Sequence, residues 1–156
     1  MTAPAKYTLN QIDLGALIAG VVAVIFSFFP SFIRAKETEE LVGKYKDVEH
    51  LSNAWFSYAT WGMILVILAT VVVALIAFAP HALPTTIPWR PIAAVSGILG
   101  AVLLIIRAFT LHQHEKIQGV VDLKIGLGWS GWITVIAAIL VAVLVSLGVA
   151  RTTKKV

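Results

Sequence analysis

The chain has 156 residues, of which 59% are hydrophobic and only 13% are charged, about half the usual charged share. Its mean hydropathy is +0.91, and a soluble domain of this length could not cover so much apolar surface. The composition excludes a soluble enzyme, a disordered chain and a disulfide scaffold, and it indicates an integral membrane protein. The chain has no cysteine, so disulfides, cysteine metal sites and thiol catalysis are excluded as well.

The net charge is +4, with twelve lysines and arginines. These residues lie mainly between the apolar segments and at the C-terminus, and they form no run of five or more. The charge therefore gives no electrostatic footprint for nucleic acid. Basic residues that flank membrane spans account for it, and we expect the lipid bilayer, not nucleic acid, as the partner.

Four segments are long and apolar enough to cross a bilayer, at residues 14–33, 57–79, 91–111 and 127–149. Each has about 20 to 23 residues, or about 30–35 Å of helix, which matches the hydrocarbon thickness of a bilayer. The sequence therefore predicts an all-α fold, a four-helix transmembrane bundle that forms a single domain over residues 1–156.

Local signals place the ends of these helices. Asn10 and Asp13 are expected to cap the first span, and Pro30 is expected to kink or end it. The link at 80–91 has four prolines, so it cannot be helical throughout, and Pro91 suits the first position of the third helix.

The segment 34–54 is the longest stretch between spans. Its apolar residues fall near a helical stripe with charged residues elsewhere. We therefore expect a short amphipathic helix in this first extramembrane loop, with an apolar stripe of Leu41, Tyr45, Val48 and Leu51.

Four spans put both termini on the same side of the membrane. That side has five basic residues and one acidic residue, for a net charge of about +4, whereas the opposite side has six basic and seven acidic residues, for about −1. Counts of basic residues alone decide nothing here. The net charge and the basic tail at 151–155 favour a multi-pass protein of the plasma membrane with both termini in the cytoplasm.

The fourth span has small residues at every fourth position. At this spacing they form a groove that winds around the helix, as right-handed crossings of small-xxx-small type require. We expect packing inside the bundle, although a groove for a partner subunit and a groove for a ligand or lipid are the alternatives. The groove residues are Gly126, Ser130, Thr134, Ala138, Ala142, Ser146 and Ala150.

Arg107 is the only ionisable residue inside a predicted span. It lies about one turn from the end of that span, so its side chain can snorkel to the interface. The alternative is a buried ion pair with a carboxylate of a partner or of this chain, from Asp47, Glu49, Glu115 or Asp122.

His112, His114 and Glu115 follow closely and raise the question of a metal site, because imidazole is the commonest metal ligand. On a helix, residues two positions apart point in opposite directions, so the two histidines could share a metal only on an extended segment. Two histidines without a third clear ligand make a weak site. We predict no metal, no cofactor and no catalytic residue.

Aromatic residues cluster at the starts of the second and fourth spans. Such a cluster is typical of the aromatic belt at a membrane interface, and a stacking site for a ligand is the alternative. Its members are Trp55, Tyr58, Trp61, Trp129 and Trp132.

Five features together carry a resemblance. A short N-terminal arm precedes an apolar span that ends in Phe-Ser-Phe-Phe-Pro, and Asn-Ala-Trp comes just before the second span. A short proline-containing link follows that span, and Gly-x-Gly-Trp opens the fourth. With these features most of the chain resembles small four-span membrane proteins of actinobacteria that have no assigned activity. The resemblance implies the four-span architecture and carries over no functional residue.

We therefore expect a non-catalytic membrane protein, an accessory or scaffold subunit that packs against itself or another membrane protein. A small transporter or channel is the main alternative, but no acidic residue lies inside a predicted span, and cation pathways usually need one. A membrane enzyme that uses His112, His114 and Glu115 is the third hypothesis.

Overall fold

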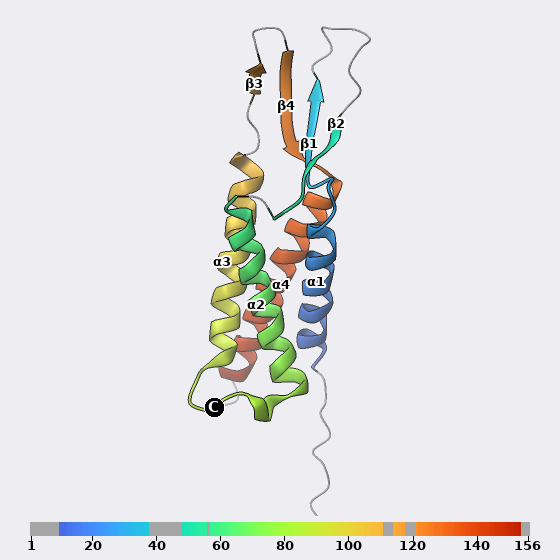
Figure 1. Cartoon of the computed structure of the whole chain (residues 1–156). Coiled ribbons are helices and arrows are strands. Elements are labelled where there is room, and N and C mark those ends of the chain that lie inside the picture. The colour runs from blue at the N-terminus through green and yellow to red at the C-terminus, as the bar shows by residue number, and fades with distance from the viewer. Residues whose placement is uncertain (1–9, 38–47, 56, 111–113, 118–120, 154–156) are drawn as a thin grey trace, which may run out of the picture.

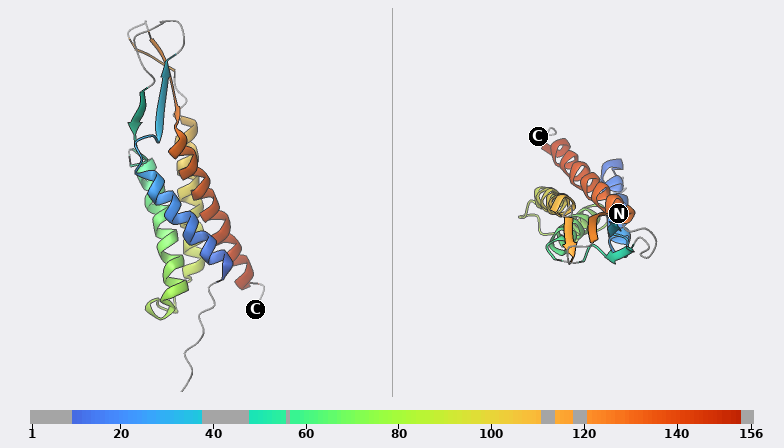
Figure 2. Two further views of the ribbon diagram at one scale, coloured as in Figure 1. Left: turned by 90° about the vertical axis from the view of Figure 1, so that its right-hand side faces the viewer. Right: turned by 90° about the horizontal axis from the view of Figure 1, so that it is seen from above.

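The computed structural model describes residues 10–37, 48–55, 57–110, 114–117 and 121–153. Within these residues four α-helices run side by side, and a β-sheet continues beyond one end of the bundle (Figure 1). The chain enters the first helix and leaves the last one at the opposite end (Figure 2). The helices are α1 (Gln11–Ser27), α2 (Ala59–Phe78), α3 (Trp89–Thr110) and α4 (Trp129–Thr153), with a short 3₁₀ turn, η1 (Pro80–Ala82), after α2.

Three of these helices, α2, α3 and α4, are long and apolar enough to cross a membrane, by length and composition. They correspond to the second, third and fourth predicted spans. The first helix is apolar but has only 17 residues. It begins before the predicted start of its span and ends at Ser27, well before the predicted end.

The signals at the helix ends are largely confirmed. Asn10 is the N-cap of α1, and its side-chain oxygen accepts a hydrogen bond from the backbone N–H of Ile12 at 3.4 Å. The same helix ends at Ser27, three residues before Pro30, because proline disfavours helical backbone in the residue before it. Pro91 is the third residue of α3 rather than the first, still within the first turn, where no N–H is needed.

Small residues fill the interior of the bundle, and large apolar residues cover its outside. Most buried residues of the helices are alanine, valine or glycine, whereas isoleucine, leucine and phenylalanine are mainly exposed. A soluble protein rarely exposes contiguous apolar patches larger than a few hundred Å². The arrangement is the one expected when lipid, as apolar as the side chains themselves, surrounds the helices and close packing holds them together.

Glycines allow the helices to approach. Between α2 and α3, a Cβ atom on Gly100 would lie 2.8 Å from the carbonyl oxygen of Gly62, closer than real Cβ contacts. Between α1 and α2, a Cβ atom on Gly20 would overlap the side chain of Thr70. Substitution of either glycine by alanine would therefore require the neighbouring helix to move away.

The sheet has four antiparallel strands in the order β2-β1-β4-β3. The central strands pair over five residues, from Ile33 opposite Leu127 to Glu37 opposite Leu123. Both loops at this end of the bundle contribute two strands each, so the sheet joins segments far apart in the sequence. The strands are β1 (Ile33–Glu37), β2 (Val48–Ser52), β3 (His114–Ile117) and β4 (Val121–Leu127).

The four helices confirm the helical fold class, whereas the sheet was not predicted and corrects the amphipathic helix expected at 34–54. Val48 and Leu51, two residues of the expected helical stripe, lie in β2, and the other two lie outside the described residues. A strand signal was present in the other loop, where apolar residues alternate along Val121–Leu127. The four-helix arrangement of the sequence prediction is confirmed, and the segments described beyond one end of the bundle contain β-strands.

Substitution of Gly100 by alanine tests the close approach of α2 and α3. We expect the free energy of unfolding in detergent to fall by about 1–3 kcal/mol, because the added methyl group meets backbone that cannot rotate away. Gly15→Ala is the matched control, since its new methyl group meets only the tip of Leu144, at 3.2 Å. Equal stability of the two variants would contradict the packing argument.

Candidate functional site

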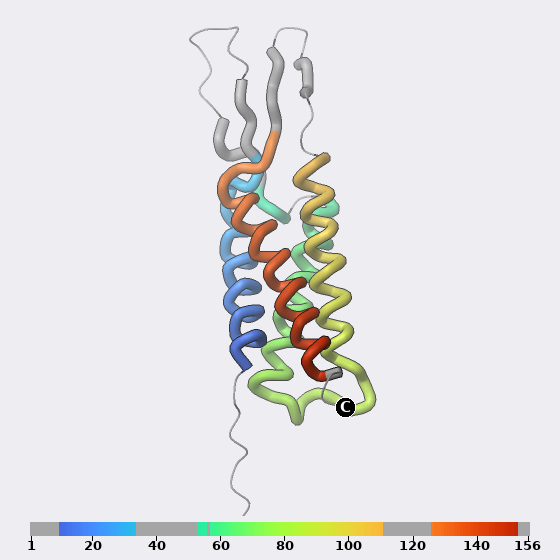
Figure 3. The backbone as a smooth tube through the Cα atoms, turned by 180° about the vertical axis from the view of Figure 1, so that it is seen from behind, coloured from blue at the N-terminus to red at the C-terminus, as the bar shows by residue number. Residues whose placement is uncertain are grey.

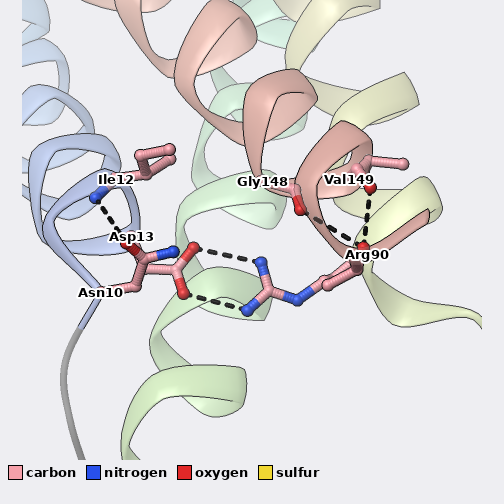
Figure 4. A network of polar contacts seen from close by, with 7 residues as sticks. Asn10, Ile12, Asp13, Arg90, Gly148 and Val149 are labelled. Carbon is pink, nitrogen blue, oxygen red and sulfur yellow. Dashed lines mark hydrogen bonds and ion pairs between the residues drawn. The ribbon is translucent and has the colours of Figure 1, made fainter. Parts of the chain in front are cut away.

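A buried ion pair closes the end of the bundle that faces away from the sheet. Asp13 of α1 accepts hydrogen bonds from Arg90 of α3, with Nη1 to Oδ1 at 3.2 Å and Nη2 to Oδ2 at 3.0 Å (Figure 4). The side chain of Asp13 is 9% exposed and that of Arg90 is 28% exposed. Two parallel charge-assisted hydrogen bonds fix both the distance and the orientation of the two side chains.

Three helices contribute to this contact. Asp13 lies in the first turn of α1, where the helix dipole favours a negative charge. Arg90 is the second residue of α3. Gly148 of α4 makes room for the pair, because a Cβ atom there would lie 3.0 Å from Nη1 of Arg90 and 3.6 Å from Oδ1 of Asp13. The pair therefore ties α1 to α3 across a glycine of α4.

The sequence analysis missed this pair. It placed Asp13 as a cap before the first span and Arg90 in the headgroup region, and it did not bring the two side chains together. In the structure α1 begins at Gln11, and Asp13 lies in its first turn. The available signal was the opposite charge of two residues predicted at the same side of the membrane. Their 77-residue separation gave no local hint that they meet.

At the other end, hydroxyl groups connect the helices to the sheet. The indole N–H of Trp55 donates to Ser27 Oγ at 3.1 Å, and Ser31 Oγ donates to Ser130 Oγ at 3.2 Å. The backbone N–H of Gly128 donates to the carbonyl of Phe32 at 2.9 Å. These contacts join the end of α1, the segment before α2 and the start of α4 at the points where the chain enters and leaves the sheet.

The predicted small-residue groove of α4 lies largely inside the bundle. Ser130, Thr134 and Ala138 are fully buried, and Ala142 is buried against Gly97 of α3. The hydroxyl of Thr134 donates to the carbonyl of Ser130, and that of Ser146 to the carbonyl of Ala142. Gly126 and Ser146, near the ends of the groove, are partly exposed. Most of the groove is therefore occupied by helices of the same chain.

Arg107 lies at the sheet end of α3. Its guanidinium carbon is 5.3 Å from the centroid of the Tyr58 ring, within the range of a cation–π contact. The hydroxyl of Tyr58 hydrogen-bonds the side chain of Thr110. This contact links the last turn of α3 to the start of α2 and keeps the charge near the end of the bundle.

The aromatic residues gather at the sheet end, where they were predicted to form an interfacial belt. Trp61, Trp129 and Trp132 are exposed. Trp129 makes edge contacts with Phe26 and Phe29, with ring centroids 5.7 and 5.5 Å apart. Trp55 instead points its N–H into the bundle, as its bond to Ser27 shows, and stacks on Phe28.

The predicted histidine cluster is only partly described. His112 lies outside the described residues, and His114 and Glu115 lie in β3. Among the residues that the structure describes, no group of three histidine, aspartate or glutamate residues could hold a metal ion.

An apolar groove runs between α1 and α4, which lie side by side along the bundle (Figure 3). Its volume is about 340 Å³, within the range of ordinary ligand sites. The lining side chains are all aliphatic or glycine, and the groove is open to the outside of the bundle. The lining residues are Gly15, Ile18, Ala19 and Val22 of α1, and Ile133, Ile136, Ala137, Leu140 and Leu144 of α4.

No protein-family model and no curated protein matches this chain.

The ion pair can be tested by removing one partner at a time. Arg90→Gln should lower the free energy of unfolding by about 3 kcal/mol, because it leaves a buried carboxylate without its cation. Asp13→Asn should cost less, since Arg90 can reach water. The combination of Asp13→Leu with Arg90→Met should recover much of the loss, as replacement of a buried pair by apolar residues often does.

Titration with a denaturing detergent gives these free energies. Arg151→Gln is the matched control, because Arg151 lies at the same end of the bundle and is exposed. If Arg90→Gln is no more destabilising than this control, the ion pair does not hold α1 against α3.

Proposed function

We propose that the protein is a non-catalytic, multi-pass protein of the plasma membrane, an accessory or scaffold subunit that presents its β-sheet outside the bilayer to a second protein or a second copy of itself. The observation that carries this proposal is the position of the sheet. It extends from one end of an apolar helical bundle and is formed by both loops at that end (Figure 1).

The bundle suits a membrane on two grounds. Three helices have spanning length and composition, and the large apolar side chains face outward. We take α1 as the fourth span. Its 17 residues make about 26 Å of helix, and the exposed Phe28 and Phe29 extend its apolar surface towards the 30 Å of a hydrocarbon core.

The sheet suits recognition because of its edges. In the described part of the chain, β2 and β3 are the outer strands, so each has one backbone edge that no other strand of the sheet covers. Such edges add a strand from a partner through main-chain hydrogen bonds. The hydrogen bond from Gly128 to Phe32 joins the chain just before β1 to the chain just after β4, and so connects the central strands to the end of the bundle.

Transport and catalysis find less support. A transporter needs polar groups that converge on a cavity within the bilayer, whereas the groove between α1 and α4 is lined by aliphatic residues and glycine. Asp13, a buried carboxylate of α1, is paired with Arg90. The enzyme hypothesis rests on the histidine cluster, to which the described residues add no further ligand.

Cysteine labelling tests the topology, and the absence of native cysteines makes each label specific. We expect cysteines at Thr2 and Thr153 to resist a membrane-impermeant thiol reagent in intact cells, because the side of the termini has a net charge of about +4 and ends in the basic tail at 151–155. A cysteine at Ser52 should react. Labelling of Thr153→Cys from outside would reverse the orientation.

Photo-crosslinking tests the interaction surface. A photoreactive amino acid at His50 in β2 or at Lys116 in β3 should give adducts of defined mass in intact membranes, either with a second copy or with one other protein. The same group at Ala82 in η1, at the other end of the bundle, is the control. If the sheet positions give no adduct beyond the control, the scaffold proposal fails.

A further inference from the structure

We propose that the groove between α1 and α4 binds one acyl chain of an anionic phospholipid whose phosphate lies against Arg151. The groove has a distinct floor and rim. Ala19 and Ala137 are buried at its floor, whereas Ile18, Ile136 and Leu140 are exposed along its rim. Small residues below and branched residues above make a channel in the outer surface of the bundle.

The length of the groove suits one acyl chain. Along α4 it runs from Ile133 to Leu144, a rise of eleven residue steps or about 16 Å of helix. The hydrocarbon core of a bilayer is about 30 Å thick, so the groove is about as long as one acyl layer is deep. A transmembrane helix is about 10–12 Å wide and could insert only single side chains, whereas an acyl chain can fill the channel along its length.

The lining determines the chemistry of the occupant. A polar ligand would lose its hydrogen bonds to water and find none in return, since the groove is lined by aliphatic residues and glycine. A saturated or monounsaturated hydrocarbon chain has no hydrogen bonds to lose on entry. It gains fixed packing contacts that the fluid bilayer does not supply.

A positive charge lies at one end of the groove. Arg151 follows Ile133 by 18 residues, five full helical turns, so it lies on the same face of α4. It follows Leu144 by seven residues, about 10 Å further towards the end of the helix, and it is exposed. Gln11 lies on the matching face of α1, seven residues before Ile18, and is also exposed.

The side chains of Arg151 and Gln11 favour an anionic headgroup. The other charged residues described near this end, Asp13 and Arg90, form an ion pair with no net charge, so the guanidinium of Arg151 dominates. A phosphate at the headgroup level would receive donors from both Arg151 and Gln11 while its acyl chain enters the groove. A phospholipid with its phosphate at Arg151 therefore belongs to the leaflet on the side of the termini, and its acyl chain enters the groove at Leu144 and runs towards the middle of the bilayer.

Native mass spectrometry of the full chain in detergent tests the site. The probes are phosphatidylglycerol and phosphatidylcholine with identical acyl chains, added after delipidation. We expect one bound phosphatidylglycerol per chain, with a preference of about fivefold over phosphatidylcholine, the size expected for one basic residue at an anionic headgroup. Arg151→Gln should remove the preference and leave weaker binding of both lipids.

Two further measurements test the acyl chain. Ala137→Leu should fill the floor of the groove and reduce binding of both lipids, whereas Ala74→Leu on α2, outside the groove, should not. In the unmodified protein, phosphatidylglycerol with a photoreactive acyl chain should label α1 and α4. Label spread evenly over all four helices, or an unchanged preference in Arg151→Gln, would overturn the proposal, and the wild-type labelling decides it even if Ala137→Leu fails to fold.

Discussion

The antiparallel packing of α1 against α4 determines the positions of all the other functional features. A short segment of chain connects α1 to β1 and another connects β4 to α4. The backbone N–H of Gly128 donates to the carbonyl of Phe32 between these two segments, and the strands pair from Ile33 opposite Leu127 onwards. At the other end the Asp13 carboxylate lies beside α4 at Gly148. The helix pair and the central strand pair are thus one continuous antiparallel unit, and α2, α3 and the outer strands flank it.

The energetics of this unit depend on small residues rather than on many polar contacts. Inside a bilayer, apolar side chains gain little by leaving lipid, so helix association needs close packing. Interhelical hydrogen bonds in membranes contribute only about 0.6 kcal/mol on average, and several hydroxyl groups here, such as Thr134 and Thr70, bond their own helix. The ion pair differs, because an unpaired buried carboxylate would cost several kcal/mol. The ion pair therefore favours the arrangement in which the start of α1 lies next to the start of α3.

The sequence predicts the helices well and the sheet poorly, for a physical reason. A membrane helix is specified locally, by about 20 apolar residues and by caps such as Asn10 and Pro30, so composition and spacing suffice. Each strand here has four to seven residues, and β1 pairs with a strand about 90 positions away. Val48 and Leu51 are three residues apart, a spacing that also fits a helix. The Asp13–Arg90 pair escaped prediction likewise, because it depends on which helices are neighbours.

Because the interior of the bundle is tightly packed, any binding site of the protein has to lie on its surface. The bundle core consists mainly of alanine, valine and glycine, and close approaches such as that of Gly62 to Gly100 leave no space for a substrate between those helices. The small residues of α4, from Ser130 to Ala142, are used in the same internal packing. They therefore cannot also form the main surface for a partner subunit, which was the alternative to internal packing in the sequence analysis. What α1 and α4 leave free is the outer groove between them and the strands at their ends, so recognition of lipid and of protein would each use one part of the same helix pair.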